Sequence, residues 1–343
     1  MNSNFFGILL IAIGSFASSI YYLPLKRLKN WSWETGWIVQ GLFAWIIGPW
    51  VVAMLTVPHL FEIIGQSPAS SIYMPILFGL GWGIGGLTWG LSIRYLGIGL
   101  GNSLPLGITL ALSTLIPPFM DGKGGELIST RPGLVTVVGV VIALVGIAFC
   151  GWAASIKDKE LKSDADSSGD FDFKKGLIVA LIAGVMSACF AFGEKSGQAM
   201  IDIAKQYNPG SIWVNNPVYA VLLIGGFVFN MVYCLWLSVK NKSFGDYTKA
   251  NTPLSSYYIF AAVAGLLWFS QFVFKGMGTN KMSADMSYVT WCLLFSLVIL
   301  FSNVIGIFTG EWKGVSRRTI LTLIVGLVIL IFSVMIIGFA KVI

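Results

Sequence analysis

Long apolar runs alternate with short polar connections along the whole chain. An α-helix needs about 20 mostly apolar residues to cross the hydrocarbon layer of a membrane. Ten runs reach that length, at residues 5–23, 36–57, 73–93, 98–119, 133–153, 176–194, 214–239, 257–275, 283–309 and 319–340. One long polar segment, SIKDKELKSDADSSGDFDFKK at 155–175, divides the runs into five and five. The pattern predicts an all-α membrane protein with ten transmembrane helices.

The two sets of five runs repeat each other. At an offset of 186 to 187 residues similar residues coincide: Trp82 with Trp268, Arg94 with Lys281, and Arg131 with Arg318. Because each set holds an odd number of spans, the second set enters the membrane in the opposite direction. The sequence therefore predicts two inverted five-helix repeats, 1–154 and 176–343, joined by a charged linker at 155–175. Inverted repeats of this kind build transporters, whose substrate site lies near the membrane midplane.

The composition fits this class of protein. Of the 343 residues, 56% are hydrophobic and only 11% are charged, with a mean hydropathy of +0.81, whereas about a quarter of the residues in a soluble domain are charged. The net charge of +7 comes from Lys and Arg in the short connections. There they meet lipid headgroups, so the charge predicts a bilayer and not nucleic acid as the partner. Most of the 22 Lys and Arg residues lie on the side of the linker, which predicts a cytoplasmic linker and both termini outside.

The segment GLGWGIGG at 79–86 contains the GxGxxG spacing of dinucleotide-binding loops. It lies inside an apolar run and not between a strand and a helix, so this interpretation fails. Gly79 with Gly83, and Gly81 with Gly85, have the GxxxG spacing that lets membrane helices approach closely. We expect the cluster to be a packing surface. No cofactor is predicted, and a single histidine with four scattered cysteines predicts no metal site.

Several of the predicted helices carry aromatic and polar residues at spacings that share one helix face. These residues are Trp82 and Trp89 in run 73–93; Asn102, Thr109 and Ser113 in run 98–119; Trp268, Gln271 and Lys275 in run 257–275; and Asp285, Tyr288 and Cys292 in run 283–309. Any one of them could serve helix packing alone. Together they offer flat rings for the C–H face of a sugar and polar partners for its hydroxyl groups. We expect these faces to line a sugar cavity.

Two carboxylates compete for the role of a proton carrier. Glu194 lies in FGEKSGQ at the end of the sixth run, and Asp285 lies early in the ninth. A carboxylate inside a membrane is costly when charged, so it can load and unload a proton. The alternatives are that Glu194 and Lys195 reach out to the membrane interface, and that Asp285 forms a structural ion pair with Lys275 or Lys281. The sequence alone does not choose between the two carboxylates.

The connection PLKRLKNWSWETGW at 24–37 is basic and rich in tryptophan. Trp31, Trp33 and Trp37 are typical of an interfacial belt, with the basic residues on the cytoplasmic side. The same interpretation applies to GEWKGVSRR at 310–318. We expect both segments to act mainly as membrane anchors and cytoplasmic gates.

Five segments together resemble the bacterial L-rhamnose–proton symporter family: YYLPLKRLKNWSWETGW, FGLGWGIGGLTWGLSIRYLG, LGITLALSTLIPPF, WFSQFVFKG and GEWKGVSRR. The similarity extends along essentially the whole chain. It implies the five-plus-five fold of the drug/metabolite transporter superfamily and uptake of L-rhamnose, or a related deoxyhexose, with a proton across a bacterial inner membrane. The family pattern places a carboxylate near Ser287 and less charge near Glu194. This chain has Asp285 in place of a carboxylate near Ser287, and we hold the hypothesis that Glu194 has taken over the coupling role of the family's carboxylate.

Two other functions stay open on the sequence alone. One is an exporter or exchanger of another small metabolite, and the other is a membrane sugar sensor that binds without transporting. An enzyme is not predicted, because the sequence shows no convergent set of paired acids, multiple histidines or a Ser/His pair. The predicted partners are a small-molecule sugar, a proton and the lipid bilayer.

Overall fold

The computed structural model describes residues 3–161, 172–250, 252–282 and 289–338, and within these ranges the chain forms helices and turns without a β-strand. Ten helical segments among these residues are long and apolar enough to cross a membrane, which confirms the predicted fold class. Many large apolar side chains remain exposed on the outside of the bundle, such as Leu55, Ile128 and Val232. A helix surface of this kind suits contact with lipid.

The spans follow the predicted order with small shifts at their ends. The first half contains α1 (Ser3–Ile20), α2 (Tyr22–Leu25), α3 (Trp33–Gly41), the π-helical η1 (Leu42–Ile47), α4 (Gly48–Thr56), α6 (Ser70–Leu115), α7 (Pro117–Met120) and α9 (Arg131–Leu161). The second half contains α10 (Phe173–Ser196), α12 (Asn216–Asn241), α13 (Leu254–Lys281), α14 (Thr290–Phe308) and α15 (Arg317–Gly338). The connections hold α5 (Leu60–Gln66), α8 (Glu126–Ser129), α11 (Gln198–Tyr207) and the 3-10 helix η3 (Ser243–Thr248).

The third and fourth spans are joined at a single residue. The predicted runs 73–93 and 98–119 left four residues between them, but in α6 only Gly97 leaves the helical conformation, with φ 79° and ψ 170°. A positive φ of this size is costly for a residue with a Cβ atom and easy for glycine. Gly97 therefore lets the chain reverse into the next span almost without a loop.

The glycine cluster in α6 packs against two other helices, as predicted. A Cβ atom on Gly79 would overlap the carbonyl oxygen of Leu222 in α12, and one on Gly83 would lie 3.0 Å from Phe229 of the same helix. A Cβ atom on Gly85 would lie 2.6 Å from the backbone nitrogen of Ser187 in α10. The glycines thus let α6 approach α10 and α12 closely, as small residues do in membrane helices.

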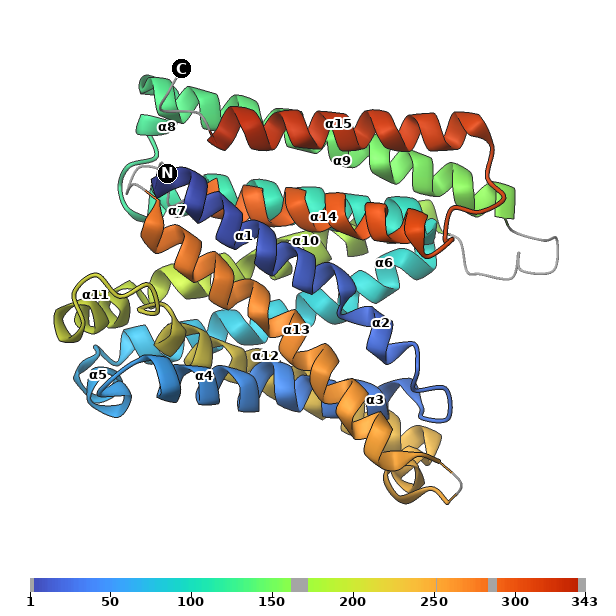
Figure 1. The fold of residues 1–343 in the computed structure, drawn as a ribbon, viewed down its shortest axis with the longest axis horizontal. Helices are drawn as coiled ribbons and strands as arrows, with labels where there is room; N and C mark the ends of the chain where they lie inside the picture. The colour runs from blue at the N-terminus through green and yellow to red at the C-terminus, as the bar shows by residue number, and fades with distance from the viewer. Residues whose placement is uncertain (1–2, 162–171, 251, 283–288, 339–343) are drawn as a thin grey trace.

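The packing of helices from the two halves follows a matching scheme. The first span, α1, packs on α13 and α14, and the sixth span, α10, packs on both parts of α6. The fifth and tenth spans, α9 and α15, lie side by side along one edge of the bundle (Figure 1). If each span is replaced by its counterpart in the other half, such as the first by the sixth, the pairs of neighbouring spans stay the same. The scheme agrees with two related halves, and their inverted orientation stays a prediction.

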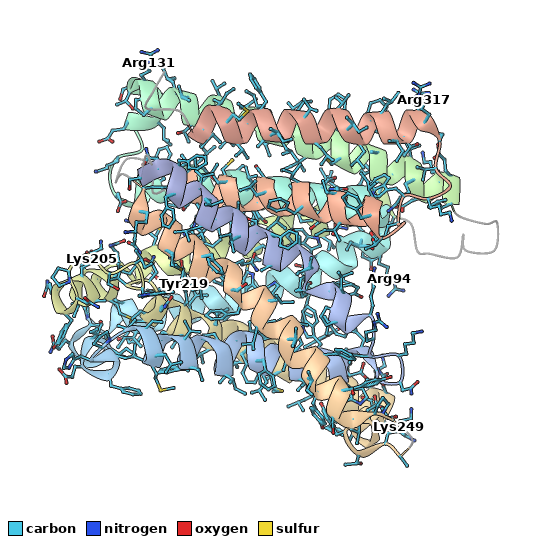
Figure 2. All side chains as sticks on the ribbon, viewed as in Figure 1. Arg94, Arg131, Lys205, Tyr219, Lys249 and Arg317 are labelled. Carbon is cyan, nitrogen blue, oxygen red and sulfur yellow. The ribbon has the colours of Figure 1, made fainter. Side chains whose placement is uncertain are left out.

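The bundle has two ends, which we name by the linker. The linker end holds the last turn of α9, the turn between α2 and α3, and η3; the far end holds α5, α8 and α11 (Figure 1). The helical part of the chain reaches further into the predicted linker than expected, since α9 continues to Leu161 and α10 begins at Phe173. The division into units at 155–175 stays a prediction. Arg94, Lys249 and Arg317 lie at the linker end, and Arg131 and Lys205 at the far end (Figure 2).

Candidate functional site

A cavity of about 650 Å³ opens between the two halves of the bundle. Six of the residues that the sequence singled out line it: Trp82, Trp89, Asn102, Thr109, Trp268 and Gln271. They come from both parts of α6 and from α13, so residues of three of the predicted faces lie around one cavity. The volume lies in the range of about 300–1,000 Å³ that is typical of small-molecule sites. We call this space the tryptophan cavity.

Edge-on and tilted indole rings form the apolar wall of the tryptophan cavity. The ring centre of Trp45 lies 5.8 Å from that of Trp82 and 6.0 Å from that of Trp268, and Trp82 lies 5.4 Å from Trp268. Trp37 joins this group, with its ring centre 5.8 Å from Trp45. Flat rings in these arrangements offer faces against which an apolar C–H surface can pack.

The expected interfacial belt of tryptophans is only partly observed. Trp33 is about half exposed, as the prediction requires, but Trp31 is buried and Trp37 lines the tryptophan cavity. The indole N–H of Trp37 donates to Asn230 Oδ1 at 3.1 Å. The belt prediction is therefore wrong for Trp31 and Trp37, because both indole N–H groups bond to the second half of the chain, that of Trp31 to the carbonyl oxygen of Asp246 at 2.9 Å.

The polar groups of the tryptophan cavity are partly engaged with one another. The indole N–H of Trp89 donates to Asn102 Oδ1 at 2.8 Å, and the amide nitrogen of Gln271 donates to the carbonyl oxygen of Trp268 at 2.8 Å. The Thr109 hydroxyl lies 2.8 Å from the carbonyl oxygen of Pro105. The amide NH₂ of Asn102 and the amide oxygen of Gln271 make no hydrogen bond within the described chain. They are therefore the polar groups that a ligand in this cavity would meet.

A second cavity, of about 460 Å³, lies toward the far end. Its walls carry many charged and amide side chains: Asp121, Lys123, Glu126, Glu194, Lys195, Gln198, Asn215 and Lys275. We call it the polar cavity. Lys275, which the sequence placed on the same face as Trp268 and Gln271, lines this cavity and not the tryptophan cavity.

Glu194 is the buried centre of the polar cavity. Its Oε2 atom forms an ion pair with the ammonium of Lys275, and its Oε1 atom accepts hydrogen bonds from the Tyr219 hydroxyl at 2.5 Å and from Asn215 Nδ2 at 3.1 Å. Glu194 is 7% exposed and Lys275 is 2% exposed. The carboxylate thus faces the interior and does not reach out to the membrane interface. Its neighbour Lys195 pairs with Asp121 at 2.7 Å, and its side chain is 23% exposed. The use of Glu194 in proton coupling stays a prediction.

The partners of Glu194 were missed by the sequence analysis. Tyr219 and Asn215 lie 25 and 21 residues further along the chain, at the start of α12, so no helical spacing connects them to α10. Figure 2 places Tyr219 inside the bundle toward the far end. The start of the ninth predicted span, with Asp285 and Tyr288, lies outside the described residues, so the structure does not choose between Asp285 and Glu194.

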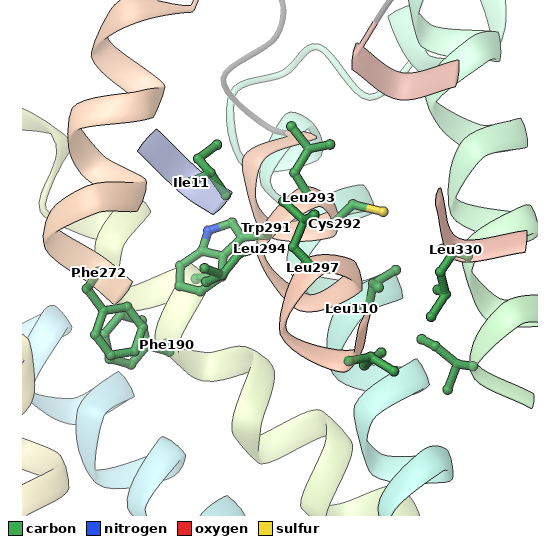
Figure 3. Packing of buried hydrophobic residues seen from close by; sticks show 14 of the residues in the cluster. Ile11, Leu110, Phe190, Phe272, Trp291, Cys292, Leu293, Leu294, Leu297 and Leu330 are labelled. Carbon is green, nitrogen blue, oxygen red and sulfur yellow. The ribbon is translucent and has the colours of Figure 1, made fainter. Parts of the chain in front are cut away.

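A layer of three aromatic rings separates the two cavities. The rings of Phe190 and Phe272 stack with centres 4.2 Å apart and planes 13° apart, and Trp291 meets Phe190 edge-on at 5.6 Å (Figure 3). Trp291 lines both cavities, and the ammonium of Lys275 lies 4.2 Å from its ring centre. A cation over an indole face is attracted by the ring. The aromatic layer therefore touches the ion pair directly.

Two further buried carboxylates lie at the linker end and line neither cavity. Glu34 Oε1 accepts hydrogen bonds from Asn241 Nδ2 at 3.0 Å and from the Ser243 hydroxyl at 2.7 Å. Asp246 Oδ2 accepts from the backbone N–H of Ser32 at 2.7 Å and from the Thr35 hydroxyl at 3.1 Å. These bonds fasten the WSWET segment to the connection between α12 and α13. We call Glu34 and Asp246 the linker-end carboxylates.

Nearly the whole chain is similar to proteins of one known family. Residues 1–342 match the family described as L-rhamnose-proton symport protein (RhaT). A protein of Cronobacter sakazakii (strain ATCC BAA-894) named L-rhamnose-proton symporter is 35% identical over 335 residues, covering 97% of this chain and 96% of that protein. Proteins of the same name from Yersinia pestis (strain Pestoides F) and Yersinia pseudotuberculosis serotype O:1b (strain IP 31758) are 33% identical over 340 residues, covering 98% of each chain.

Proposed function

Because the chain belongs to the L-rhamnose–proton symporter family, we propose that it takes up L-rhamnose, or a related deoxyhexose, together with a proton across the bacterial inner membrane. One observation carries the proposal. A sugar-sized cavity walled by indole rings adjoins a second cavity with a buried Glu–Lys pair, and only one aromatic layer separates them. The membrane location and the orientation of the chain are part of this proposal.

The sugar binds in the tryptophan cavity. A deoxyhexose has an apolar methyl group and C–H faces that pack on the rings of Trp45, Trp82 and Trp268. Its hydroxyl groups take hydrogen bonds from the NH₂ group of Asn102 and donate to the amide oxygen of Gln271. This mixture of aromatic walls and a few placed polar groups is typical of small-molecule sites.

The proton binds to Glu194. In the deprotonated state the charges of Glu194 and Lys275 balance within a buried site, and removing either charge leaves the other without a partner. A proton on Glu194 therefore loosens the contact between α10 and α13, one helical turn from the Phe190–Phe272 stack. This weakens the layer that keeps the two cavities apart.

The two cavities open in turn to opposite sides of the membrane. With the linker end in the cytoplasm, as the distribution of Lys and Arg predicts, the polar cavity faces outside and the tryptophan cavity faces inside. Sugar and proton enter from the far end, the aromatic layer opens, and both leave at the linker end by alternating access. One proton moving through a potential of 100 mV supplies about 2.3 kcal/mol, enough for a sugar gradient of about 50-fold.

The first test is the external pH of weakly buffered, de-energised cells that express the protein. Adding L-rhamnose should make the medium more alkaline, and cells with an empty vector should show no change. L-fucose, another deoxyhexose, measures how widely the site accepts related sugars. Uptake of labelled L-rhamnose without a pH change would exclude proton symport while keeping sugar transport. Neither signal, with the protein present in the membrane, would overturn the proposed substrate.

A further inference from the structure

Two glycines of α6 differ from the other glycines of the membrane spans. At Gly86 and Gly90 an added Cβ atom would meet no heavy atom within 4 Å. Elsewhere in the described chain, the glycines with such open surroundings lie in the connections, as Gly65 does in α5. Gly86 and Gly90 are both exposed, and both line the tryptophan cavity. The bare backbone of α6 therefore borders the cavity at these two positions.

Helix packing does not explain these two glycines. They have the GxxxG spacing, as Gly79 and Gly83 do, but those two lie against α12 and a Cβ atom on Gly79 would overlap the carbonyl oxygen of Leu222. No neighbouring helix comes as close to Gly86 or Gly90. Glycine inside a helix is less stable than alanine, and here no close approach of two helices offsets that cost. A different use of the open space is needed.

The two glycines form a notch about one helical turn long in the wall of the tryptophan cavity. Residues four apart share a face of a helix, so Trp82, Gly86 and Gly90 follow one another along one face of α6. A rise of about 6 Å separates Gly86 from Gly90. The indoles of Trp82 and Trp89, which line the same cavity, lie before the notch and beside its second glycine. We call Gly86 and Gly90 the glycine notch.

An unpaired acceptor in the same cavity points to a ligand in this space. Gln271 of α13 lines the tryptophan cavity and is 6% exposed. Its amide nitrogen donates to the carbonyl oxygen of Trp268, but its Oε1 atom accepts no hydrogen bond from the described chain. This oxygen is not one of the fully enclosed unpaired atoms, as Oε1 of Gln40 is. Buried polar groups almost always have a partner, so the occupant of the cavity should bring a hydroxyl donor.

We propose that the glycine notch is the seat of the sugar ring and sets the size of the sugar that the site accepts. The ring lies against the backbone of α6 at Gly86 and Gly90, and one of its hydroxyl groups donates to Gln271 Oε1. Glycine is suited to this position because a ligand can approach its backbone closely. A side chain on either glycine would fill volume that the ring needs. The inference rests on the proposed function and adds a size determinant to it.

The test measures the Kd for L-rhamnose and the Tm of the full-length protein in lipid nanodiscs. Each glycine of the notch is replaced by a small and by a large side chain, in Gly86→Ala, Gly86→Leu, Gly90→Ala and Gly90→Leu. Gly65→Ala and Gly65→Leu are the matched controls, because Gly65 is also helical with open surroundings but lines neither cavity. Gly79→Ala shows the effect of filling a helix contact.

Binding and stability should change in opposite directions at the notch. Alanine at Gly86 or Gly90 should raise the Kd for L-rhamnose about tenfold, as expected for one extra carbon in a binding site, and leucine should raise it about 100-fold or more. The Tm of the alanine variants should equal or exceed that of the unsubstituted protein, because alanine favours the helix. The Gly65 variants should keep the Kd within about twofold. Gly79→Ala should lower the Tm.

A normal Kd in either leucine variant would overturn the inference and leave the proposed function intact. A lower Tm in Gly86→Ala or Gly90→Ala, as in Gly79→Ala, would also overturn it, since the glycines would then serve packing. Equal weakening by alanine and leucine would indicate a need for a flexible helix and not for open space, with the same consequence. Absence of L-rhamnose binding to the unsubstituted protein would overturn the proposed function, and the inference with it.

Discussion

The buried carboxylates at the two ends of the molecule are held in different ways. The linker-end carboxylates, Glu34 and Asp246, accept hydrogen bonds from neutral donors only and line no cavity. Glu194 has a cation as its main partner and forms part of the wall of the polar cavity. The three side chains are similarly buried, at 3%, 8% and 7% exposure.

If Glu194 carries the proton, burial alone does not identify a proton site. A proton needs a path, and the polar cavity gives Glu194 one that Glu34 and Asp246 lack. Protonation must also change the structure. It can do so where the carboxylate balances the charge of a buried cation. Protonating a linker-end carboxylate would weaken a loop attachment, whereas protonating Glu194 would unbalance the contact between α10 and α13.

The largest expected effect comes from removing the two charges at the far end. Glu194→Gln combined with Lys275→Gln keeps the site neutral and leaves no unpaired buried charge. If Glu194 carries the proton, this double variant should lose sugar accumulation, from up to about 50-fold at 100 mV to none, because no charge moves with the sugar. Exchange of labelled for unlabelled L-rhamnose across the membrane should continue.

The matched control is Glu34→Gln, at the linker end. It keeps the shape of the side chain and touches neither cavity, so accumulation should stay close to that of the unsubstituted protein. Accumulation by the double variant at the normal level would remove Glu194 as the proton site and leave Asp285 as the candidate. Loss of accumulation in Glu34→Gln as well would end the distinction between the two ends.

The next largest effect is on stability. Lys275→Met alone leaves Glu194 buried without its cation, which should cost about 3–5 kcal/mol in the free energy of unfolding. Glu194→Gln added to Lys275→Met removes the unpaired charge and should recover most of that loss. The Tm of the purified variants, followed by tryptophan fluorescence in one detergent, gives their order of stability. A double variant less stable than Lys275→Met alone would show that the ion pair is not the source of the loss.

Helical periodicity was enough to predict much of the tryptophan cavity. Trp82 and Trp89 share a face of α6, and Trp268 and Gln271 share a face of α13; all four line that cavity. Lys275 follows the same spacing but lies on the other side of the aromatic layer. Periodicity gives the direction of a side chain around the helix axis, but it does not show where another helix closes the space along that axis.

The residues that the sequence analysis missed depend on features that spacing does not encode. Trp45 lies in the π-helical η1 and lines the cavity, and no residue pattern indicated that change of helix type. Tyr219 and Asn215 reach Glu194 through contact between helices. Trp37 meets the cavity through a contact between the two halves, in which its indole N–H donates to Asn230 of α12. The resemblance to a family pointed to the WSWET segment, but its contacts required the structure.

A smaller effect is expected at the linker end, with a defined pH dependence. Burial raises the pKa of Asp246, but hydrogen bonds from Ser32 and Thr35 and the charge of Lys249 outweigh it, so the pKa lies below its usual value. The stability that Asp246 adds is therefore complete above the unfolded pKa of about 3.9 and is lost as the pH falls through the folded pKa. Asp246→Asn should cost about 1 kcal/mol, because a neutral amide oxygen accepts these hydrogen bonds more weakly than a carboxylate does.

The check is the Tm of Asp246→Asn and of the unsubstituted protein between pH 3 and pH 8. The gap between the two should be constant from about pH 5 upward and should close below about pH 4. A gap that widens toward low pH would mean that the folded pKa is raised and that Asp246, like Glu194, is poised to take up a proton. That result would break the contrast between the two ends.

The smallest effect is expected where an ion pair is open to solvent. Lys26 and Glu311 pair at 2.7 Å beside the tryptophan cavity, with side chains 49% and 46% exposed, so water and salt screen their attraction. Exposed pairs of this kind contribute about 0–1 kcal/mol. Lys26→Gln should therefore change the KM for L-rhamnose less than about threefold, and 1 M salt should remove even that change, since the Debye length is then about 3 Å.

Glu311→Gln should have the same effect as Lys26→Gln, because either substitution breaks the same bond. A tenfold change in KM that survives high salt would place Lys26 or Glu311 in contact with the sugar, and the tryptophan cavity would then hold a charged binding group as the polar cavity does.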